Sequence, residues 1–304
     1  IAERQFVLSP DEILLLNPNT GTCPIFRTRR DAEITLGIYK RVPVLLRETE
    51  LQVESPWEAK LRLLINMSGD SASFRTQDDL ESDGWKAEGS VFHRDGQQML
   101  PLFEAKMLHQ FNNRWATFRG RDYRDATVDE WKDAYFVALP RYWVSPGDFP
   151  QIQEAFGQSR WLTGWRKIAR STDERTLIPF KFVYGGLGDS GNTVIVTGPR
   201  EMLEPVLSSF ALDFVARQKV GGANFNFFQF AQLPVLPPAL FVQKCEWSPG
   251  ESVRSFARQR TLELSYNAWD MAPFAEDLGD VDSSGAVNPP FIWDDERRFL
   301  LRTE

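Results

Sequence analysis

Apolar side chains recur at helical spacing in several stretches of the chain. In residues 31–42, Ile34 and Ile38 fall on one face, which is the pattern of an amphipathic helix packed on a core. Thr127, with Glu130 three residues later, has the form of a helix N-cap with acidic first-turn residues. We also predict helices in residues 148–169, 199–217, 253–278 and 294–302.

Shorter apolar runs predict β-strands. Residues 175–184 and 193–197 flank the glycine-rich segment 185–191, so we expect them to pair as a hairpin. Strands are also expected at residues 12–16, 57–67 and 135–139. Together these elements predict an α+β protein: a mixed-sheet domain over residues 1–241, followed by a mainly helical C-terminal portion over residues 242–304 that packs on it.

Composition narrows the class of protein. The chain of 304 residues is 42% hydrophobic and 25% charged, as is usual for a soluble globular protein of one large or two modest domains. No apolar run approaches a membrane span and no signal peptide opens the chain, so we expect a cytoplasmic protein without a membrane partner. Cys23 and Cys245 stand far apart, and His93 and His109 have few candidate co-ligands. No disulfide framework or metal site is therefore expected.

The overall charge is the wrong sign for a generic nucleic-acid binder. The net charge is −7, whereas such proteins are usually basic. Basic residues nevertheless concentrate in residues 27–41, 114–124 and 160–175, and Arg greatly outnumbers Lys. Arg binds phosphate and guanine edges in a bidentate manner. A GC-rich genome would also supply Arg in place of Lys, so composition leaves both explanations open.

Residues 106–124 combine the side chains that read DNA. Gln and Asn can pair with adenine and Arg with guanine, and further arginines can hold phosphates and set the register. The competing interpretation is a polar-edged strand whose Phe111 and Trp115 fill the core. The candidate DNA contacts in this segment are His109, Gln110, Asn112, Asn113, Arg114, Arg119, Arg121 and Arg124.

Two further polar segments supply candidates. The turn at residues 169–176 can cap a helix, form an internal Asp–Arg pair or touch the DNA backbone. Residues 217–228 place two glycines at a helix end, where the backbone can approach a phosphate closely or the helix simply stops. The candidate DNA contacts in these segments are Arg170, Arg175, Lys219, Asn224 and Asn226, and the candidate phosphate contacts are Arg27, Arg29 and Arg30.

Two strings imitate catalytic or cofactor motifs. Asn288-Pro289-Pro290-Phe291 has the form of the loop with which amino-group DNA methylases grip the exocyclic amine of a flipped base. No strand, glycine-rich turn and helix suited to a cofactor surround it, so we reject a catalytic role. Tyr184-Gly185-Gly186-Leu187-Gly188 precedes a strand instead of the helix that a nucleotide-binding turn needs. No catalytic residue is assigned.

Several strings, in one order, resemble the domain that follows the catalytic half of large adenine-specific DNA methyltransferases in restriction and phage-defence systems. The resemblance spans nearly the whole chain. It is carried by Leu16-Asn17-Pro18-Asn19-Thr20, Cys23-Pro24-Ile25-Phe26-Arg27 and Arg30-Asp31-Ala32-Glu33-Ile34, then by residues 102–111, 169–176, 216–228, 232–238 and 266–278.

The resemblance implies a target-recognition region like that of type IIG, BREX or DISARM methyltransferases. Its partners would be double-stranded DNA and the methyltransferase domain of the same polypeptide. In that family the catalytic motif and the S-adenosylmethionine (SAM) site lie upstream, so this fragment would have no cofactor and no enzymatic activity by itself. The resemblance also implies that Asn288 belongs to a variable linker. The alternatives are a protein-interaction module of a defence complex, which the negative charge fits better, and a catalytic methylase that uses Asn288–Phe291.

Overall fold

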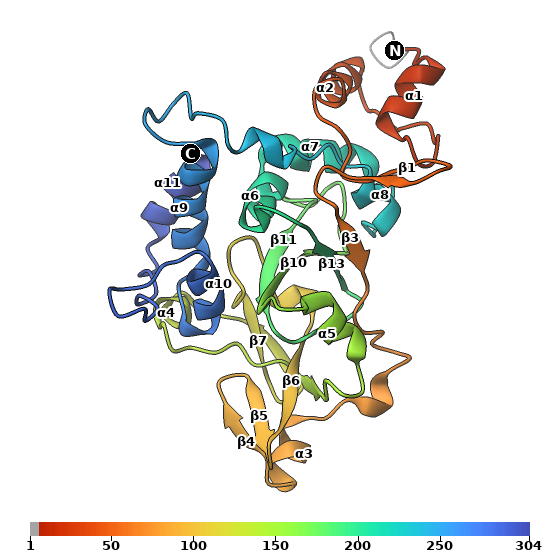
Figure 1. The fold of residues 1–304 in the computed structure, drawn as a ribbon. Helices are drawn as coiled ribbons and strands as arrows, with labels where there is room; N and C mark the ends of the chain where they lie inside the picture. The colour runs from red at the N-terminus through yellow and green to blue at the C-terminus, as the bar shows by residue number, and fades with distance from the viewer. Residues whose placement is uncertain (1–5) are drawn as a thin grey trace. The chain divides into compact units, whose positions relative to one another are not determined.

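The computed structural model describes residues 6–304 and has an α+β fold with several small sheets (Figure 1). The chain divides into two compact units, each assembled from three segments. Unit 1 comprises residues 1–61, 167–178 and 196–256, and unit 2 comprises residues 62–166, 179–195 and 257–304. Residues 1–241, expected as one domain, are distributed over both units, and the last boundary between the units falls between residues 256 and 257.

Unit 1 is mainly helical. Capping boxes begin its first two helices: Ser9 with Glu12, and Thr28 with Asp31, an arrangement that satisfies two backbone N–H groups at each helix start. Its elements are α1 (Pro10–Leu16), α2 (Arg29–Tyr39), β1 (Arg47–Glu48), β2 (Val53–Glu54), a 3₁₀ turn (Arg200–Met202), α6 (Leu203–Ser208), α7 (Phe210–Lys219), α8 (Phe227–Ala231) and a 3₁₀ turn (Pro238–Leu240).

The core of unit 1 joins segments that are distant in the sequence. Leu45 and Leu233 are fully buried, and the Leu45 N–H donates to the Leu233 carbonyl at 2.8 Å. The buried Trp57 donates its indole N–H to the Leu236 carbonyl at 3.0 Å. The N-terminal segment of unit 1 therefore packs against residues 233–238, whose sequence is Leu-Pro-Val-Leu-Pro-Pro.

Unit 2 contains the larger sheets. Strand β10 lies between β11 and β13 and is antiparallel to both. Strand β6 pairs antiparallel with β5 and β9 and parallel with the short β12. Its strands are β4 (Lys86–Glu88), β5 (Val91–Arg94), β6 (Gln97–Phe103), β7 (Ala116–Arg119), β8 (Asp122–Asp125), β9 (Tyr142–Val144), β10 (Trp161–Arg166), β11 (Pro179–Val183), β12 (Gly186–Leu187) and β13 (Gly191–Ile195).

The helices of unit 2 flank these sheets, and its main core is rich in Phe and Leu, including Phe180, Phe182 and Leu102. Strand β3 (Lys60–Arg62) and helix α9 (Val253–Ser265) contain the points at which the chain passes from one unit to the other. The remaining elements of unit 2 are 3₁₀ turns at Ser71–Ser73, Ala105–Met107 and Trp269–Met271, and helices α3 (Gln77–Ser82), α4 (Val128–Lys132), α5 (Pro150–Phe156), α10 (Ala272–Asp277) and α11 (Asp295–Thr303).

Several predicted elements differ from the structure. Residues 12–16 form most of helix α1, because Ser9, Pro10 and Glu12 build a helix start that outweighs the short apolar run. Residues 148–169 hold a short helix and then strand β10, whose first five residues are all buried. The two strands expected as a hairpin both pair with β10 instead of with each other.

Other expectations are confirmed. The predicted helices over residues 31–42 and 294–302 correspond to α2 and α11, and Thr127 caps α4 in a capping box with Glu130. One further expectation is wrong, because residues 135–139 were expected to form a strand and contain none. Over residues 6–304, no helix combines the length and apolarity that crossing a bilayer requires.

Candidate nucleic-acid interface

The candidate segments at residues 27–30, 170–175 and 217–226 meet in unit 1. An antiparallel bridge joins Ile168 to Asn224, and the Ala169 N–H donates to the Ala223 carbonyl at 3.1 Å. Arg27 Nη2 donates to Ser171 Oγ at 3.4 Å. The three segments are therefore neighbours in space, although more than a hundred residues separate the first from the second and about forty separate the second from the third.

Four exposed arginines belong to this region: Arg27, Arg29, Arg30 and Arg170. We call them the arginine cluster. Arg29 and Arg30 occupy the first turn of α2, where the positive end of the helix dipole disfavours a cation. Within residues 6–304, Arg30 is the one member of the cluster with an ion-pair partner, Glu33 at 3.7 Å, and both side chains are largely exposed. Helix stability therefore gives no reason for two arginines at these positions.

Arg175 and Arg217 hold the turn at residues 170–176 against α7. Arg217 donates to the carbonyls of Ser171, Asp173 and Glu174 and pairs with Asp213 at 3.0 Å. Arg175 bonds to the Ser208 carbonyl and lies over the Phe210 ring, 4.7 Å from its centroid. Arg175, which was predicted to contact DNA, thus makes contacts within the protein that hold the turn in place. Arg217, which the sequence analysis did not single out, fixes the loop that carries Arg170.

The candidates that follow α7 differ in exposure. Asn224 is exposed, and Asn226 is the N-cap of α8, its N–H donating to Gln229 Oε1 at 2.8 Å. Lys219 Nζ donates to the Leu16 carbonyl at 2.8 Å and to Asn17 Oδ1 at 2.6 Å, above the Tyr39 ring. Burial lowers the pKa of the Lys219 amine to about 7, because a charged amine loses hydration there.

A pocket of about 330 Å³ adjoins the arginine cluster. We call it the basic pocket. Among residues 6–304, its charged lining residues are Arg27, Arg217 and Lys219, and no carboxylate of this described range lines it. The other lining residues are Asn17, Thr22, Cys23, Pro24, Ile25, Ser171, Gln218, Val220, Gly221, Phe228, Gln229 and Gln232.

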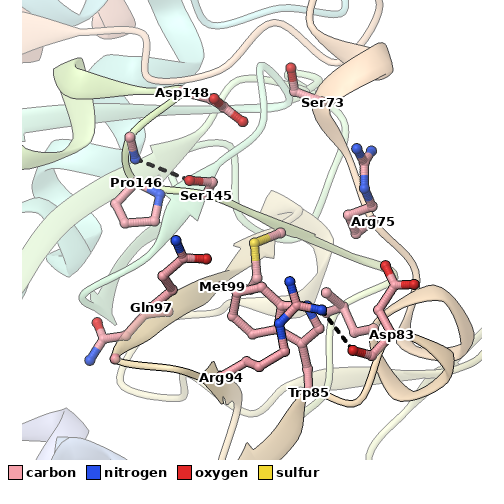
Figure 2. A pocket seen from close by; sticks show the side chains of 14 residues that line it. Ser73, Arg75, Asp83, Trp85, Arg94, Gln97, Met99, Ser145, Pro146 and Asp148 are labelled. Atoms are coloured by element: carbon pink, nitrogen blue, oxygen red, sulfur yellow. Dashed lines mark hydrogen bonds between the residues drawn. The ribbon is translucent and has the colours of Figure 1, made fainter.

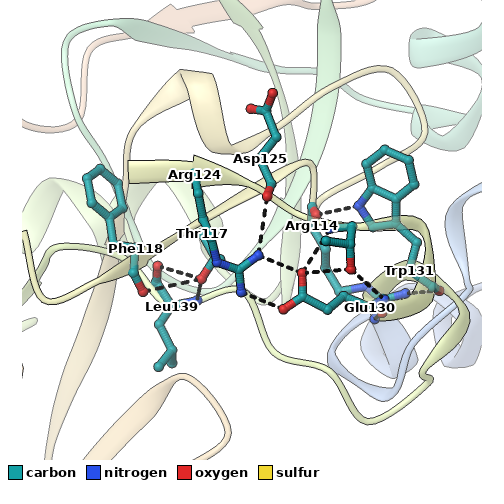
Figure 3. Close-up of polar contacts among 9 residues, drawn as sticks. Arg114, Thr117, Phe118, Arg124, Asp125, Glu130, Trp131 and Leu139 are labelled. Atoms are coloured by element: carbon teal, nitrogen blue, oxygen red, sulfur yellow. Dashed lines mark hydrogen bonds and ion pairs between the residues drawn. The ribbon is translucent and has the colours of Figure 1, made fainter. Parts of the chain in front are cut away.

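In unit 2, by contrast, the predicted DNA contact Arg114 lies in the interior. Arg114 is 1% exposed and donates to five carbonyls, those of Glu130, Trp131, Asp133, Phe136 and Asn267. Figure 3 shows Arg114 beside two of these partners, Glu130 and Trp131. Burial lowers the pKa of its guanidinium, an effect that Asp270 and Asp133 oppose. The N–H groups of its guanidinium therefore form hydrogen bonds within the protein.

The neighbours of Arg114 are also buried or in contact with other side chains. Gln110 and Asn112 are buried, and Asn113 donates its side-chain N–H to Asp270 Oδ2 at 2.6 Å. His109 stacks on Trp115 with ring centroids 4.3 Å apart. In this conformation the segment does not present these groups to a DNA groove. The competing sequence interpretation, in which the segment fills the core, describes their positions better.

The rest of the predicted unit 2 candidates lie on a hairpin. Strands β7 and β8 pair across a turn at Gly120, whose φ of 61° favours glycine. Arg119, Arg121 and Arg124 are exposed there. Arg124 is held by both carboxylate oxygens of Glu130, at 2.7 and 2.5 Å (Figure 3). This bidentate pair lowers the pKa of Glu130 to about 2.

A larger pocket of about 580 Å³ in unit 2 has mixed charge (Figure 2). Arg94 lies over the Trp85 ring, 4.9 Å from its centroid, and donates to the Asp83 carbonyl at 2.7 Å. The charged residues of its lining are two arginines, Arg75 and Arg94, and two aspartates, Asp83 and Asp148. Its charged lining thus contains both signs, whereas the described charged residues that line the basic pocket are all basic.

The Asn288 motif is tied into the C-terminal part of unit 2. Asn288 donates its side-chain N–H to Asp280 Oδ1 at 2.7 Å, and its carbonyl accepts the Tyr266 hydroxyl at 2.8 Å. Phe291 packs against the cluster that contains Tyr266 and Phe274. These contacts give the motif a structural explanation. Among residues 6–304, no group of three His, Cys, Asp or Glu side chains is arranged to hold a metal.

Comparison with known proteins leaves the site to be interpreted from its own geometry. No protein-family model, no curated protein and no solved structure matches this chain.

Proposed function

We propose that this chain is the DNA-docking, target-recognition region of an adenine-N6 DNA methyltransferase of a restriction or phage-defence system. In this proposal, methyl transfer and SAM binding belong to a separate domain of the same polypeptide. The chain itself contributes affinity for double-stranded DNA and sequence choice. The sequence resemblance supplies the family, and the geometry of unit 1 supplies the surface.

The observation that carries the proposal is the arginine cluster. Two of its members stand where a helix dipole opposes positive charge, and all four are exposed. Positive charge kept at a position where it disfavours folding is typical of a surface selected for binding. Phosphate groups are the natural counter-charge, because guanidinium binds them in a bidentate manner.

The test is the salt dependence of duplex binding by fluorescence anisotropy, for the wild-type chain and an Arg29→Glu/Arg30→Glu variant. Each lost phosphate contact lowers the slope of log affinity against log salt by about 1. We expect the variant to lose about two units of slope and about 10- to 100-fold in affinity at low salt. Arg302→Glu, an exposed charge reversal in α11, is the matched control. Equal slopes for the wild-type chain and the double variant would reject the proposed surface.

A protein-interaction module is the second candidate, and the charge of unit 2 favours it. Unit 2 contains 26 acidic and 19 basic residues, whereas unit 1 contains 16 of each. A module that binds a basic protein through unit 2 would leave duplex affinity negligible at low salt. Such a module would also give the arginine variant no phenotype in the same experiment.

A further inference from the structure

The basic pocket has a property that the surrounding surface lacks. Unit 1 as a whole has equal numbers of acidic and basic residues, yet the described residues that line the pocket include three basic side chains and no carboxylate. A concave site lined by one sign of charge concentrates ions of the other sign. Its volume of about 330 Å³ is within the range of small-molecule sites. The ligand it favours is therefore a small anionic group.

The three cations contribute differently. Asp213 and three carbonyls hold Arg217 in place, and Lys219 is anchored by the Leu16 carbonyl and Asn17. Arg27 is exposed, and its one hydrogen bond is a long contact with Ser171 Oγ. Arg217 and Lys219 thus hold fixed positions in the lining, where Asp213 offsets the charge of Arg217 and burial disfavours the charged form of Lys219. Arg27 is the cation placed to close on an anion.

Gly221 has no structural reason to be glycine. A Cβ atom built on it meets nothing within 4 Å, and its φ lies outside the left-handed region. The N–H groups of Gly221 and Gly222 donate to no residue in the described part of the chain. Glycine in such a place lets the backbone approach a ligand closely and use its N–H groups. Of these two glycines, Gly221 lines the pocket and Gly222 does not.

Apolar side chains complete the lining. Ile25 is 76% exposed and Phe228 is 54% exposed, and both line the pocket beside the cations. An aromatic ring that is exposed next to a phosphate-sized basic site can pack on a sugar or a base. A bare inorganic anion would leave these side chains without a partner, whereas a nucleotide would use both parts of the pocket.

We propose that the basic pocket binds the phosphate of one nucleotide, through Arg27 and the backbone at Gly221, with Phe228 packing on the attached sugar or base. The nucleotide is either part of DNA, in which case this inference rests on the proposed function, or a free mononucleotide. The chemistry recognised is the same in both cases.

The experiment measures binding of three probes to the full chain by titration: inorganic phosphate, adenosine monophosphate and a short duplex. The test variant is Gly221→Leu, which adds a bulky side chain to a residue of the pocket lining, and its matched control is Gly222→Leu in the same loop. Because a hydrogen bond to a charged group contributes enough to change affinity about tenfold, we expect Gly221→Leu to weaken binding of the nucleotide probe about tenfold. The control should bind as the wild type does, and thermal unfolding checks that both variants are folded. Phe228→Ala should weaken adenosine monophosphate more than it weakens inorganic phosphate.

The probes separate the sources and the two proposals. Weakening of duplex binding alone assigns the pocket to a DNA phosphate, and weakening of mononucleotide binding alone assigns it to a free nucleotide. If Gly221→Leu binds every probe as the wild type does, or if no probe binds, the pocket inference is wrong. Duplex binding that still depends on Arg29 and Arg30 would then leave the proposed function standing. An Arg27→Glu variant repeats the test without adding bulk to the loop.

Discussion

In unit 1, exposed arginines stand at a helix start and on a nearby turn. In unit 2, the most centrally placed arginine, Arg114, is sealed in the interior and bonded to five carbonyls. The whole excess of negative charge also lies in unit 2, because unit 1 is balanced. The same residue type therefore serves as a cross-link in one region and is left available in the other, and the packing around each arginine decides which.

The largest effect should come from breaking the cross-link. Arg114→Met removes donors from five buried or half-buried carbonyls, and we expect it to lower the free energy of unfolding by about 3–5 kcal/mol. Urea denaturation monitored by tryptophan fluorescence measures this loss. Arg124→Met removes an exposed arginine of the β7–β8 hairpin, and it should lower the free energy of unfolding by no more than about 1 kcal/mol. Equal costs for the two variants would contradict the structural role of Arg114.

A smaller effect should distinguish Lys219 from the exposed cations of unit 1. Its folded pKa of about 7 lies below the ordinary lysine value of 10.5, so the unfolded chain binds more protons between these values. Stability should therefore rise as pH increases above 7, by about 2 kcal/mol up to pH 9, and the penalty should be complete about one pH unit below 7. In Lys219→Met this rise should disappear from denaturation curves measured across the range. A variant with the wild-type pH dependence would show that Lys219 is charged at no cost.

The smallest effect sharpens the contrast within α2. Arg29→Glu places an acid in the first turn of the helix, which should stabilise the protein by about 0.3–1 kcal/mol at low salt. The same change should weaken duplex binding, so stability and binding should move in opposite directions. Arg302→Glu, in the last turn of α11, should destabilise by a similar amount because a cation is favourable there. High salt should shrink both effects, and a loss of stability in Arg29→Glu would undo the argument from the helix dipole.

The sequence by itself determined the elements whose signals are local. The presence of α2, the cap of α4 and the length of α11 follow from a few neighbouring residues, because caps and helical periodicity act within one or two turns. The α+β class followed from the same patterns. The segments at residues 27–30, 170–175 and 217–226 could also be named as candidates, although nothing in the sequence showed that they meet.

The tertiary structure decided what depends on distant partners. Strand β10 is buried along nearly its whole length between β11 and β13, so it lacks the alternation that identifies a strand, and its insertion prevents the expected hairpin. In the sequence, Gln110, Asn112 and Arg114 have the side chains of DNA-reading residues, but the fold buries all three. One acceptor of Arg114 is the carbonyl of Asn267, more than 150 residues later in the chain. Whether a polar side chain binds a ligand or its own backbone depends on which acceptors the fold brings to it, and those acceptors are set by long-range packing that no local pattern encodes.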